Sequence, residues 1–252
     1  MMKYCIKSDI GRVRKENQDR ADIAFLSNWT LAMLCDGMGG HFGGAKCAEL
    51  TIETLKNYFL QTFPDNLKFN DKRNINKWFN NALSQIKKTL DKFIEENFHF
   101  ESMGTTLTAA LIFNSNGTIY IFNVGDSRTY VYNGLLYQTT QDQNFLNQLV
   151  SNDILSFEEA KKHPDANKLV SCIGPRMIMK CDGFLINSDA NVKYVILTSD
   201  GLHDYVEKPA IEQILQNKKL NLEAKAQKLV EFAIRNSSQD NISIEIVELE
   251  NE

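Results

Sequence analysis

Apolar residues recur at three- and four-residue spacing along two long stretches in the first hundred residues of the chain. Ala48, Ile52, Leu55 and Phe59 share one helical face by this spacing, and the same period returns over residues 75–93 after a proline-containing break. A polar face accompanies each apolar face. The pattern therefore predicts two long amphipathic helices in succession.

Shorter helical patterns occur later in the chain. Residues 209–215 and 222–234 repeat the three- and four-residue spacing and predict two more helices. Residues 142–176 are polar and mixed, and short helical patches lie around 145–150 and 157–161.

Runs of β-branched and aromatic residues, bounded by turn residues, predict the strands. These runs occupy residues 4–8, 21–27, 30–35, 106–113, 118–124, 128–132, 177–186 and 193–199. Asn28-Trp29 suits a hairpin between the second and third runs, and Asn133-Gly134 predicts a type I′ hairpin turn.

The last strand is predicted by strict alternation. Ile242, Ile244 and Ile246 alternate with Ser243 and Glu245. Successive side chains of a strand point to opposite faces, so we expect a half-buried strand with one polar face.

Strands in hairpin succession, with one helix pair inserted between strand groups and another near the end, do not alternate as β-α-β units do. The order predicts an α+β fold with largely antiparallel sheets. The chain has only four prolines and no Pro/Gly/Ser-rich linker, internal repeat or low-complexity tract. We therefore expect one domain spanning residues 1–252.

Composition narrows the classes of protein. The 252 residues are 43% hydrophobic and 24% charged, with a net charge of −4, which fits a globular protein and disfavours wholesale binding to nucleic acid. Charges interrupt the N-terminal residues, and no stretch approaches the length of a membrane span. The five cysteines form no Cys-x-x-Cys pair. We expect reduced, buried thiols in a cytoplasmic protein.

Aspartates follow or precede several predicted strands. Asp36, Asp126 and Asp200 each stand beside a glycine at a strand end, and Asp240 directly precedes the final strand. If these strand ends meet, the carboxylates form one acidic cluster that requires a cation, because like charges at close range raise one another's pKa. Oxygen ligands without a His or Cys cluster favour Mg²⁺ or Mn²⁺ over zinc. The alternative is a set of independent turns, in which Asp and Gly are ordinary residues.

The glycine cluster at residues 37–44 follows a strand and opens a helix, as nucleotide-binding loops do. The dinucleotide fingerprint fails because Phe42 occupies its third glycine position, and no Gly-Lys-Ser/Thr follows for a phosphate loop. The cluster instead suits close approach of the backbone to a phosphate or to a metal-bound water. A cysteine-nucleophile phosphatase is also excluded, because Cys172 and Arg176 are only four residues apart.

Six motifs in order resemble those of the metal-dependent serine/threonine protein phosphatases of type 2C, in their compact bacterial form. They are Arg14-Lys15-Glu16-Asn17-Gln18-Asp19, Asp36-Gly37-Met38-Gly39-Gly40-His41, Met103-Gly104-Thr105-Thr106, Val124-Gly125-Asp126-Ser127-Arg128, Ser199-Asp200-Gly201-Leu202 and Asp240-Asn241. The resemblance covers nearly the whole chain. It implies a four-layer α/β/β/α sandwich, in which two packed antiparallel sheets are flanked by helix pairs, with a flap-like segment at about 142–180.

The resemblance also implies roles for individual residues. Asp36 and the carbonyl of Gly37 resemble the bridge between two Mn²⁺ or Mg²⁺ ions, and Asp200 and Asp240 resemble the other carboxylates of that centre. The remaining matches are Asp19 as a metal partner acting through water, Asp126 with Asp204 at a weaker third ion, and Arg14 as the catalytic guanidinium that binds the substrate phosphate.

The chain departs from the family's pattern at two positions. Gln18 replaces a frequent acidic residue, and Met38 stands where some members place a histidine that acts as general acid. We expect neither His41 nor His163 to be essential, with metal-bound water supplying the proton.

Other residues of the motifs have plainer interpretations. We expect Gly104-Thr105-Thr106 to serve packing near the site, and Ser127 and Arg128 to be turn and surface residues.

The implied activity is hydrolysis of phosphoserine and phosphothreonine in proteins, by direct attack of a water that bridges the metals. One alternative is an inactive member that binds phosphoproteins as a regulatory module. Another is a phosphatase for a single phosphorylated regulator of a partner-switching pathway. The implied partners are phosphoprotein substrates and an opposing serine/threonine kinase, and the chain is expected to be a monomer.

Overall fold

Two five-stranded antiparallel sheets form the centre of the computed structural model, which describes residues 2–39 and 43–249. The first sheet has the spatial order β1 (Lys3–Asp9), β12 (Ile242–Glu248), β11 (Tyr194–Thr198), β8 (Arg128–Tyr132) and β9 (Leu136–Gln138). The second has the order β10 (Asp182–Ile186), β7 (Thr118–Val124), β6 (Leu107–Phe113), β3 (Trp29–Cys35) and β2 (Arg20–Leu26). A small third sheet pairs β4 (Gly37–Met38) with β5 (Gly104–Thr105).

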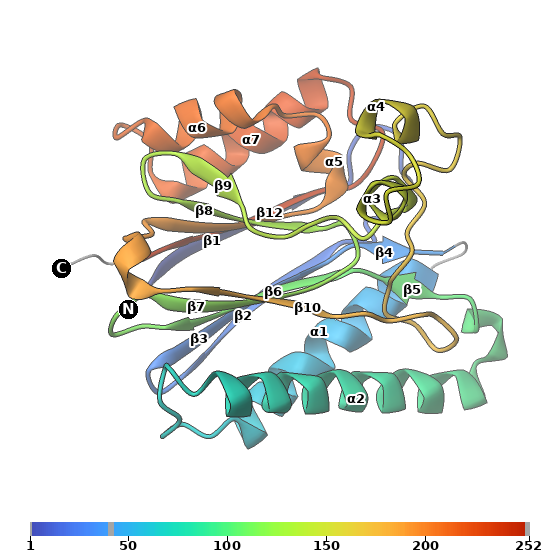
Figure 1. Cartoon of the computed structure of the whole chain (residues 1–252), viewed down its shortest axis with the longest axis horizontal. Helices are drawn as coiled ribbons and strands as arrows, with labels where there is room; N and C mark the ends of the chain where they lie inside the picture. The colour runs from blue at the N-terminus through green and yellow to red at the C-terminus, as the bar shows by residue number, and fades with distance from the viewer. Residues whose placement is uncertain (1, 40–42, 250–252) are drawn as a thin grey trace.

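Helices cover the outer face of each large sheet (Figure 1). The second sheet carries α1 (Gly43–Thr62) and α2 (Lys72–Glu96), and the first carries α5 (Asp200–His203), α6 (Lys208–Gln216) and α7 (Leu222–Arg235). Short 3₁₀ turns lie at Phe98–Phe100 and Ser188–Ala190. This arrangement confirms the predicted α+β class and the four-layer sandwich.

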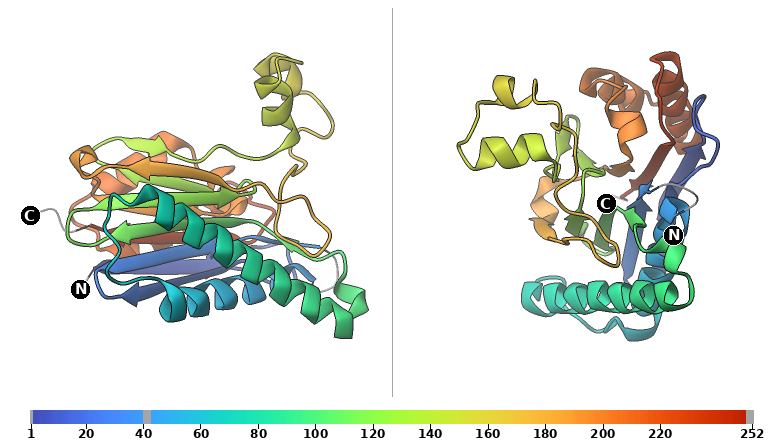
Figure 2. Two further views of the ribbon diagram at one scale, coloured as in Figure 1. Left: turned by 60° about the horizontal axis from the view of Figure 1, so that its bottom comes forward. Right: turned by 90° about the vertical axis from the view of Figure 1, so that its right-hand side faces the viewer.

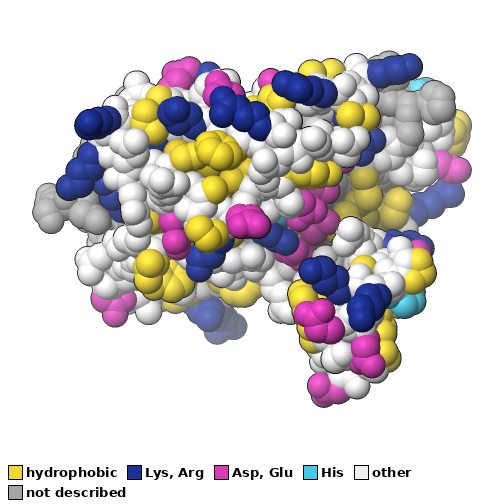
Figure 3. Space-filling model, turned by 90° about the horizontal axis from the view of Figure 1, so that it is seen from above, with side chains coloured by type: hydrophobic (Ala, Val, Ile, Leu, Met, Phe, Trp, Pro, Cys, Tyr) yellow, Lys and Arg dark blue, Asp and Glu magenta, His cyan; other side chains and the backbone are white. Residues whose placement is uncertain are grey.

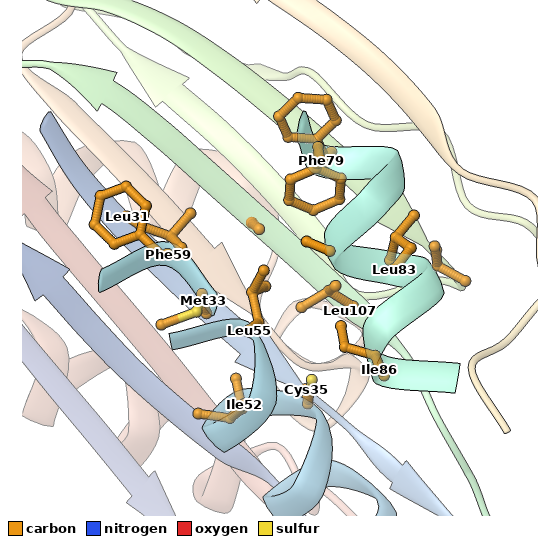
Figure 4. Packing of buried hydrophobic residues seen from close by; sticks show 14 of the residues in the cluster. Leu31, Met33, Cys35, Ile52, Leu55, Phe59, Phe79, Leu83, Ile86 and Leu107 are labelled. Carbon is orange, nitrogen blue, oxygen red and sulfur yellow. The ribbon is translucent and has the colours of Figure 1, made fainter. Parts of the chain in front are cut away.

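Three apolar clusters hold the layers together. One lies between the sheets and includes Leu34, Ile121 and Val195, all with no exposed surface. A second joins α5, α6 and α7 to the first sheet. The third packs α1 and α2 on the second sheet, where Phe79 stacks on Phe122 with ring centroids 3.7 Å apart (Figure 4). The predicted faces of the two long helices are therefore the faces that they bury.

Strand β12 differs from its sequence pattern. The alternation of Ile with Ser243 and Glu245 predicts one exposed face, but both of these side chains have no exposed surface. The prediction of a half-buried strand is wrong because β12 is paired on both sides and lies between the helix layer and the second sheet.

Two local predictions also fail. Gly134 has a φ of +116°, but Asn133 is not among the residues of positive φ. A type I′ turn needs positive φ at both residues, and here a three-residue loop joins β8 to β9 instead. The strand expected over 177–186 begins only at Asp182, because Lys180 hydrogen-bonds through its backbone to the Ser171 hydroxyl instead of to a neighbouring strand.

The segment that carries α3 (Phe145–Ser151) and α4 (Phe157–Ala160) projects from the body (Figure 2). Its base is fixed by backbone hydrogen bonds, from Gln143 N to the Gly125 carbonyl at 3.0 Å and from Val170 N to the Gln143 carbonyl at 2.9 Å. Both short helices were predicted. Across the described residues, the structure contains no helix of the length and apolarity that a membrane crossing requires.

Candidate metal centre

Strand register gathers the predicted aspartates at one end of the two sheets. Arg20 of β2 pairs with Cys35 of β3, so Asp19 and Asp36 lie side by side where these strands begin and end. In the other sheet Thr198 pairs with both Arg128 and Ile244, which brings Asp200 to the same end as the starts of β8 and β12. Asp126 and Asp240 lie two residues before these two starts. Figure 3 shows acidic side chains gathered in the hollow beside the projecting segment.

These carboxylates act on one another electrostatically. Burial, followed by the charges of Asp19, Asp200, Asp126 and Asp240, raises the pKa of Asp36 well above its usual value. Burial is also the largest cause at three neighbours: it raises the pKa of Asp19 to about 6, of Asp200 to about 7 and of Asp126 to about 8. Ionised together without a counterion, the group is electrostatically unfavourable.

Two buried oxygens of this cluster have no hydrogen-bond partner. They are Oδ1 of Asp19 and Oδ1 of Asp200. An unpartnered buried carboxylate oxygen is costly, and a cation is the partner that such an oxygen lacks here. As the side chains stand, no three potential ligands among the described residues are close enough together to hold one ion. The all-oxygen donors and the two orphaned atoms nevertheless fit a hard divalent cation.

Backbone and hydroxyl contacts hold Asp36 and Asp19 in place. The Asp36 amide donates to Thr106 Oγ1 at 2.9 Å, and Thr105 Oγ1 donates to the Asp36 carbonyl, also at 2.9 Å. Ser199 Oγ donates to Asp19 Oδ2 at 2.8 Å. Thr105 and Thr106 thus support the site through packing and hydrogen bonds, in agreement with the prediction for that motif.

Gly37 lies where no side chain fits. A Cβ atom there would be 2.4 Å from the Gly44 carbonyl oxygen and 2.7 Å from that of Gln18. The glycine lets the start of α1 and the loop before β2 close around the backbone next to Asp36. The neighbouring Met38 pairs with Gly104 across the small sheet.

Arg14 reaches this cluster from the loop between β1 and β2. Its Nη2 donates to Asp240 Oδ2 at 2.5 Å, and 54% of its side chain is exposed. The hydrogen bond to Asp240 raises the pKa of Arg14, and the charges of Asp200 and Asp36 act in the same direction. A guanidinium with free surface therefore lies at the open edge of the acidic cluster.

The structure corrects the interpretation of Ser127 and Arg128 as turn and surface residues. Ser127 has no exposed surface, and its hydroxyl lies 2.7 Å from Thr106 Oγ1. Arg128 donates twice to Asp142, at 2.8 and 2.6 Å, and its Nη2 lies 3.9 Å from Asp204 Oδ1. This ion pair joins the base of the projecting segment to the edge of the cluster.

Asp204 lies at the edge of the cluster and not among the five central carboxylates. It directly follows α5, and about half of its side chain is exposed. Burial raises its pKa, and the positive charge of Arg128 opposes that shift.

The histidines differ in position. His41 lies outside the described residues. His163 is used within the projecting segment, where its Nδ1 accepts from the Asp165 amide at 3.1 Å and its ring packs on Phe145. Sequence reasoning missed His203, which is buried with Nδ1 2.8 Å from Thr198 Oγ1. Burial, followed by the charge of Arg128, lowers the pKa of His203 well below its usual value, so the ring is neutral.

Comparison with known proteins gives a consistent result. Residues 12–233 match the family model described as protein phosphatase 2C. The chain is 30% identical to the serine/threonine phosphatase stp of Listeria monocytogenes, over 96% of this chain and 94% of that one.

Solved structures are similar over the full length. The serine/threonine phosphatase Stp1 from Staphylococcus aureus matches with a TM-score of 0.85 and 31% identity, covering 100% of this chain and 96% of that one. The catalytic domain of the serine/threonine protein phosphatase PstP, solved in complex with two manganese ions, matches with a TM-score of 0.77 and 26% identity, covering 99% of each chain.

Proposed function

This chain belongs to the protein phosphatase 2C family, and from that premise we propose which of its residues act in catalysis. The protein is a metal-dependent serine/threonine phosphatase, and its substrates are phosphoproteins. We assign the catalytic centre to the end of the sandwich where Asp36 and Asp200 lie. The observation that carries this assignment is the convergence of five carboxylates there, with two buried oxygens that lack partners.

The carboxylates divide into three roles in this proposal. Asp36, the Gly37 carbonyl, Asp200 and Asp240 would hold two central ions. Asp19 supports them through water, since Ser199 already holds its other oxygen. Asp126, together with Asp204 at the edge of the cluster, would hold a weaker third ion. Mn²⁺ and Mg²⁺ both suit this all-oxygen set, and a related structure contains two manganese ions.

Divalent cations bound there supply Lewis acidity, which lowers the pKa of water and neutralises phosphate oxygens. The chain's own part is to fix the carboxylates and to bind the substrate. Thr105, Thr106 and Ser199 hold Asp36 and Asp19 by hydrogen bonds. Arg14 binds the incoming phosphate, for which a planar guanidinium with two parallel donors is well suited.

The site's surroundings suit a protein substrate. The cluster opens to solvent beside the projecting segment. We propose that the chain acts as one catalytic domain and as a monomer, on segments phosphorylated by an opposing serine/threonine kinase. The five free cysteines, of which Cys35, Cys47 and Cys172 are buried, favour a reducing compartment such as the cytoplasm.

Phosphate release from a phosphothreonine peptide tests the assignment. We expect turnover with Mn²⁺, none in excess chelator, and a loss of at least about 100-fold in Asp36→Ala or Asp200→Ala proteins that remain folded. Asp65→Ala is the matched control, because Asp65 is exposed on the loop between α1 and α2. Full turnover in chelator, or equal loss in all three variants, would exclude the proposed centre.

A further inference from the structure

A groove lies at the end of the first sheet opposite the aspartates. Two adjoining cavities of about 650 and 410 Å³ form it and share Tyr194, Leu220, Lys225 and Glu248. We call it the lysine groove. Its rim is built from the start of β11, the end of β12, the start of β1 and the turn between α6 and α7.

Lys225 forms a fixed positive charge at the centre of this groove. Only 3% of the residue is exposed, although it carries an ammonium group. Its Nζ donates to the Leu215 carbonyl near the end of α6 and lies 3.5 Å from the Tyr194 hydroxyl. Carbonyls at a helix C-terminus are favourable partners for a cation, so the ammonium is held in one position.

Tyr194 provides a rigid aromatic base beside this charge. Nζ of Lys225 lies 5.0 Å from its ring centroid, and Nζ of Lys193 lies 5.1 Å from the same point. Tyr132 stacks on Tyr194 with centroids 5.7 Å apart. Two ammonium groups and two aromatic rings are therefore preorganised without any ligand.

Among the described residues that line the groove, positive charges outnumber negative ones. Lys3, Lys193 and Lys218 line it together with Lys225, and none of the four forms an ion pair with a described residue. Of the two acidic residues, Glu223 pairs with Lys7 at 2.6 Å, which leaves only Glu248. The whole protein has a net charge of −4, so the excess is local. Burial, followed by the charge of Lys193, lowers the pKa of Lys225, and the opposing charge of Glu248 offsets only part of this shift.

We propose that the lysine groove binds an acidic peptide segment of a protein partner. Two adjoining open cavities, both lined by lysines, fit an extended chain that carries several carboxylates better than a single compact anion. The aromatic base and the apolar stems of the lysines add contact with the peptide's own aliphatic groups. The phosphatase reaction does not use any residue of this groove.

The lysine groove, where the partner would dock, lies far from the aspartates of the proposed catalytic centre. Tyr194 and Asp200 stand at opposite ends of β11, about 20 Å apart at the usual rise of an extended strand. A phosphorylated partner that occupies both places therefore needs at least about six residues between its phosphoresidue and its acidic segment. Short phosphopeptides would reach the aspartates without touching the groove.

Fluorescence anisotropy with a labelled oligoglutamate peptide tests the proposal directly. We expect saturable binding that weakens when the ionic strength rises from about 0.05 M to about 0.3 M. The double variant Lys193→Glu/Lys218→Glu should bind the peptide at least about tenfold more weakly. The matched control is Lys87→Glu, an exposed lysine on α2, which should bind within about twofold of the unsubstituted protein.

Turnover of a short phosphothreonine peptide without acidic residues serves as the folding control and should be equal in all of these proteins. Equal binding of oligoglutamate by the double variant and the unsubstituted protein would overturn the proposal, as would an equal loss in Lys87→Glu. Binding of phosphatidylserine vesicles or a DNA oligomer at this groove, with none of the peptide, would also overturn it. Because the assay measures binding alone, its result is independent of the catalytic assignment.

Discussion

Carboxylates at strand ends form a common site only when those strand ends lie together in the fold. Otherwise each is an ordinary turn residue. Asp19 and Asp36 stand on neighbouring strands of one sheet, whereas Asp200 and Asp240 come from the other sheet. The spacing of Asp and Gly along the chain left independent turns open as an alternative. Register removes that alternative by bringing the strand ends together, and the charges of Asp19, Asp200, Asp126 and Asp240 all raise the pKa of Asp36.

Substitution of Arg14 can separate binding of the substrate phosphate from binding of the metal ions. We expect Arg14→Ala to retain Mn²⁺ binding but to lose about 10- to 150-fold in kcat/KM, which corresponds to about 1.5–3 kcal/mol for hydrogen bonds to a charged group. Arg14→Lys should recover only part, because an ammonium keeps the charge without the planar pair of donors. Steady-state kinetics on a phosphothreonine peptide and metal titration check both statements.

Arg12→Ala supplies the control for Arg14, since Arg12 is exposed two residues away on the same loop. A change below about twofold in Arg14→Ala would remove Arg14 from substrate binding, because ordinary surface substitutions produce effects of that size.

Glu245 is a buried acid that the catalytic assignment does not use. Both of its carboxyl oxygens lack hydrogen-bond partners, and burial raises its pKa well above the usual 4.5. The folded protein thus keeps a proton that the unfolded chain releases above about pH 4.5. Stability contributed by this residue therefore falls as the pH rises from there towards the folded-state pKa.

Replacing this acid should raise stability in neutral solution. We expect Glu245→Gln to stabilise the fold more at pH 8 than at pH 5, because the raised pKa of the buried carboxyl disfavours its ionised form in the folded protein. Urea unfolding at the two pH values measures the difference, with Glu53→Gln on the exposed face of α1 as control. A pH-independent effect of Glu245→Gln would show that the carboxyl is ionised in the folded state.

At the scale of elements, amphipathic helices were the most predictable part of the chain. The faces of α1 and α2 were read correctly because each helix has one buried side and one exposed side. The exposure of β12 was predicted wrongly for the opposite reason. Both faces of this strand are buried, so its alternation of apolar and polar residues does not correspond to a buried and an exposed face. The contact between Arg128 and Asp142 was also missed, because the partners are fourteen positions apart with β9 between them, and no periodicity links them.

The packing of α2 on the second sheet depends on Phe79. Its ring stacks on Phe122 at an interplanar angle of 6°, and it has no exposed surface. We expect Phe79→Ala to lower the free energy of unfolding by about 3–5 kcal/mol, as for other large-to-small changes in cores. Phe98→Ala, at a ring that is 76% exposed, should change it by less than about 0.5 kcal/mol. Denaturant titration compares the two, and similar losses would mean that the stacked ring is not part of the stabilising core.

The whole molecule separates two surfaces of opposite charge along the strands. Asp36, Asp200 and their neighbours lie at one end of the sandwich, and the lysine groove lies at the other. The net charge of −4 reveals neither the acidic end nor the basic end, because it sums the charges of both. The acidic end was predicted because its residues share a motif with glycine at strand ends. The basic end was not predicted, because Lys3, Lys193 and Lys225 come from three distant segments without a common pattern.

Metal binding at the acidic end should stabilise the entire fold. Cations that bind the folded carboxylate cluster and not the unfolded chain add about 2.7 kcal/mol at a concentration 100 times the Kd. For a domain of this size that corresponds to a rise of about 5–10 °C in Tm when Mn²⁺ replaces chelator. Calorimetry measures the shift without reference to activity. Asp200→Ala should lose most of it, since the substitution removes one of the two orphaned buried oxygens, whereas Asp65→Ala should keep it. An equal shift in both variants would place the stabilising ions elsewhere on the protein and would separate the acidic cluster from metal binding.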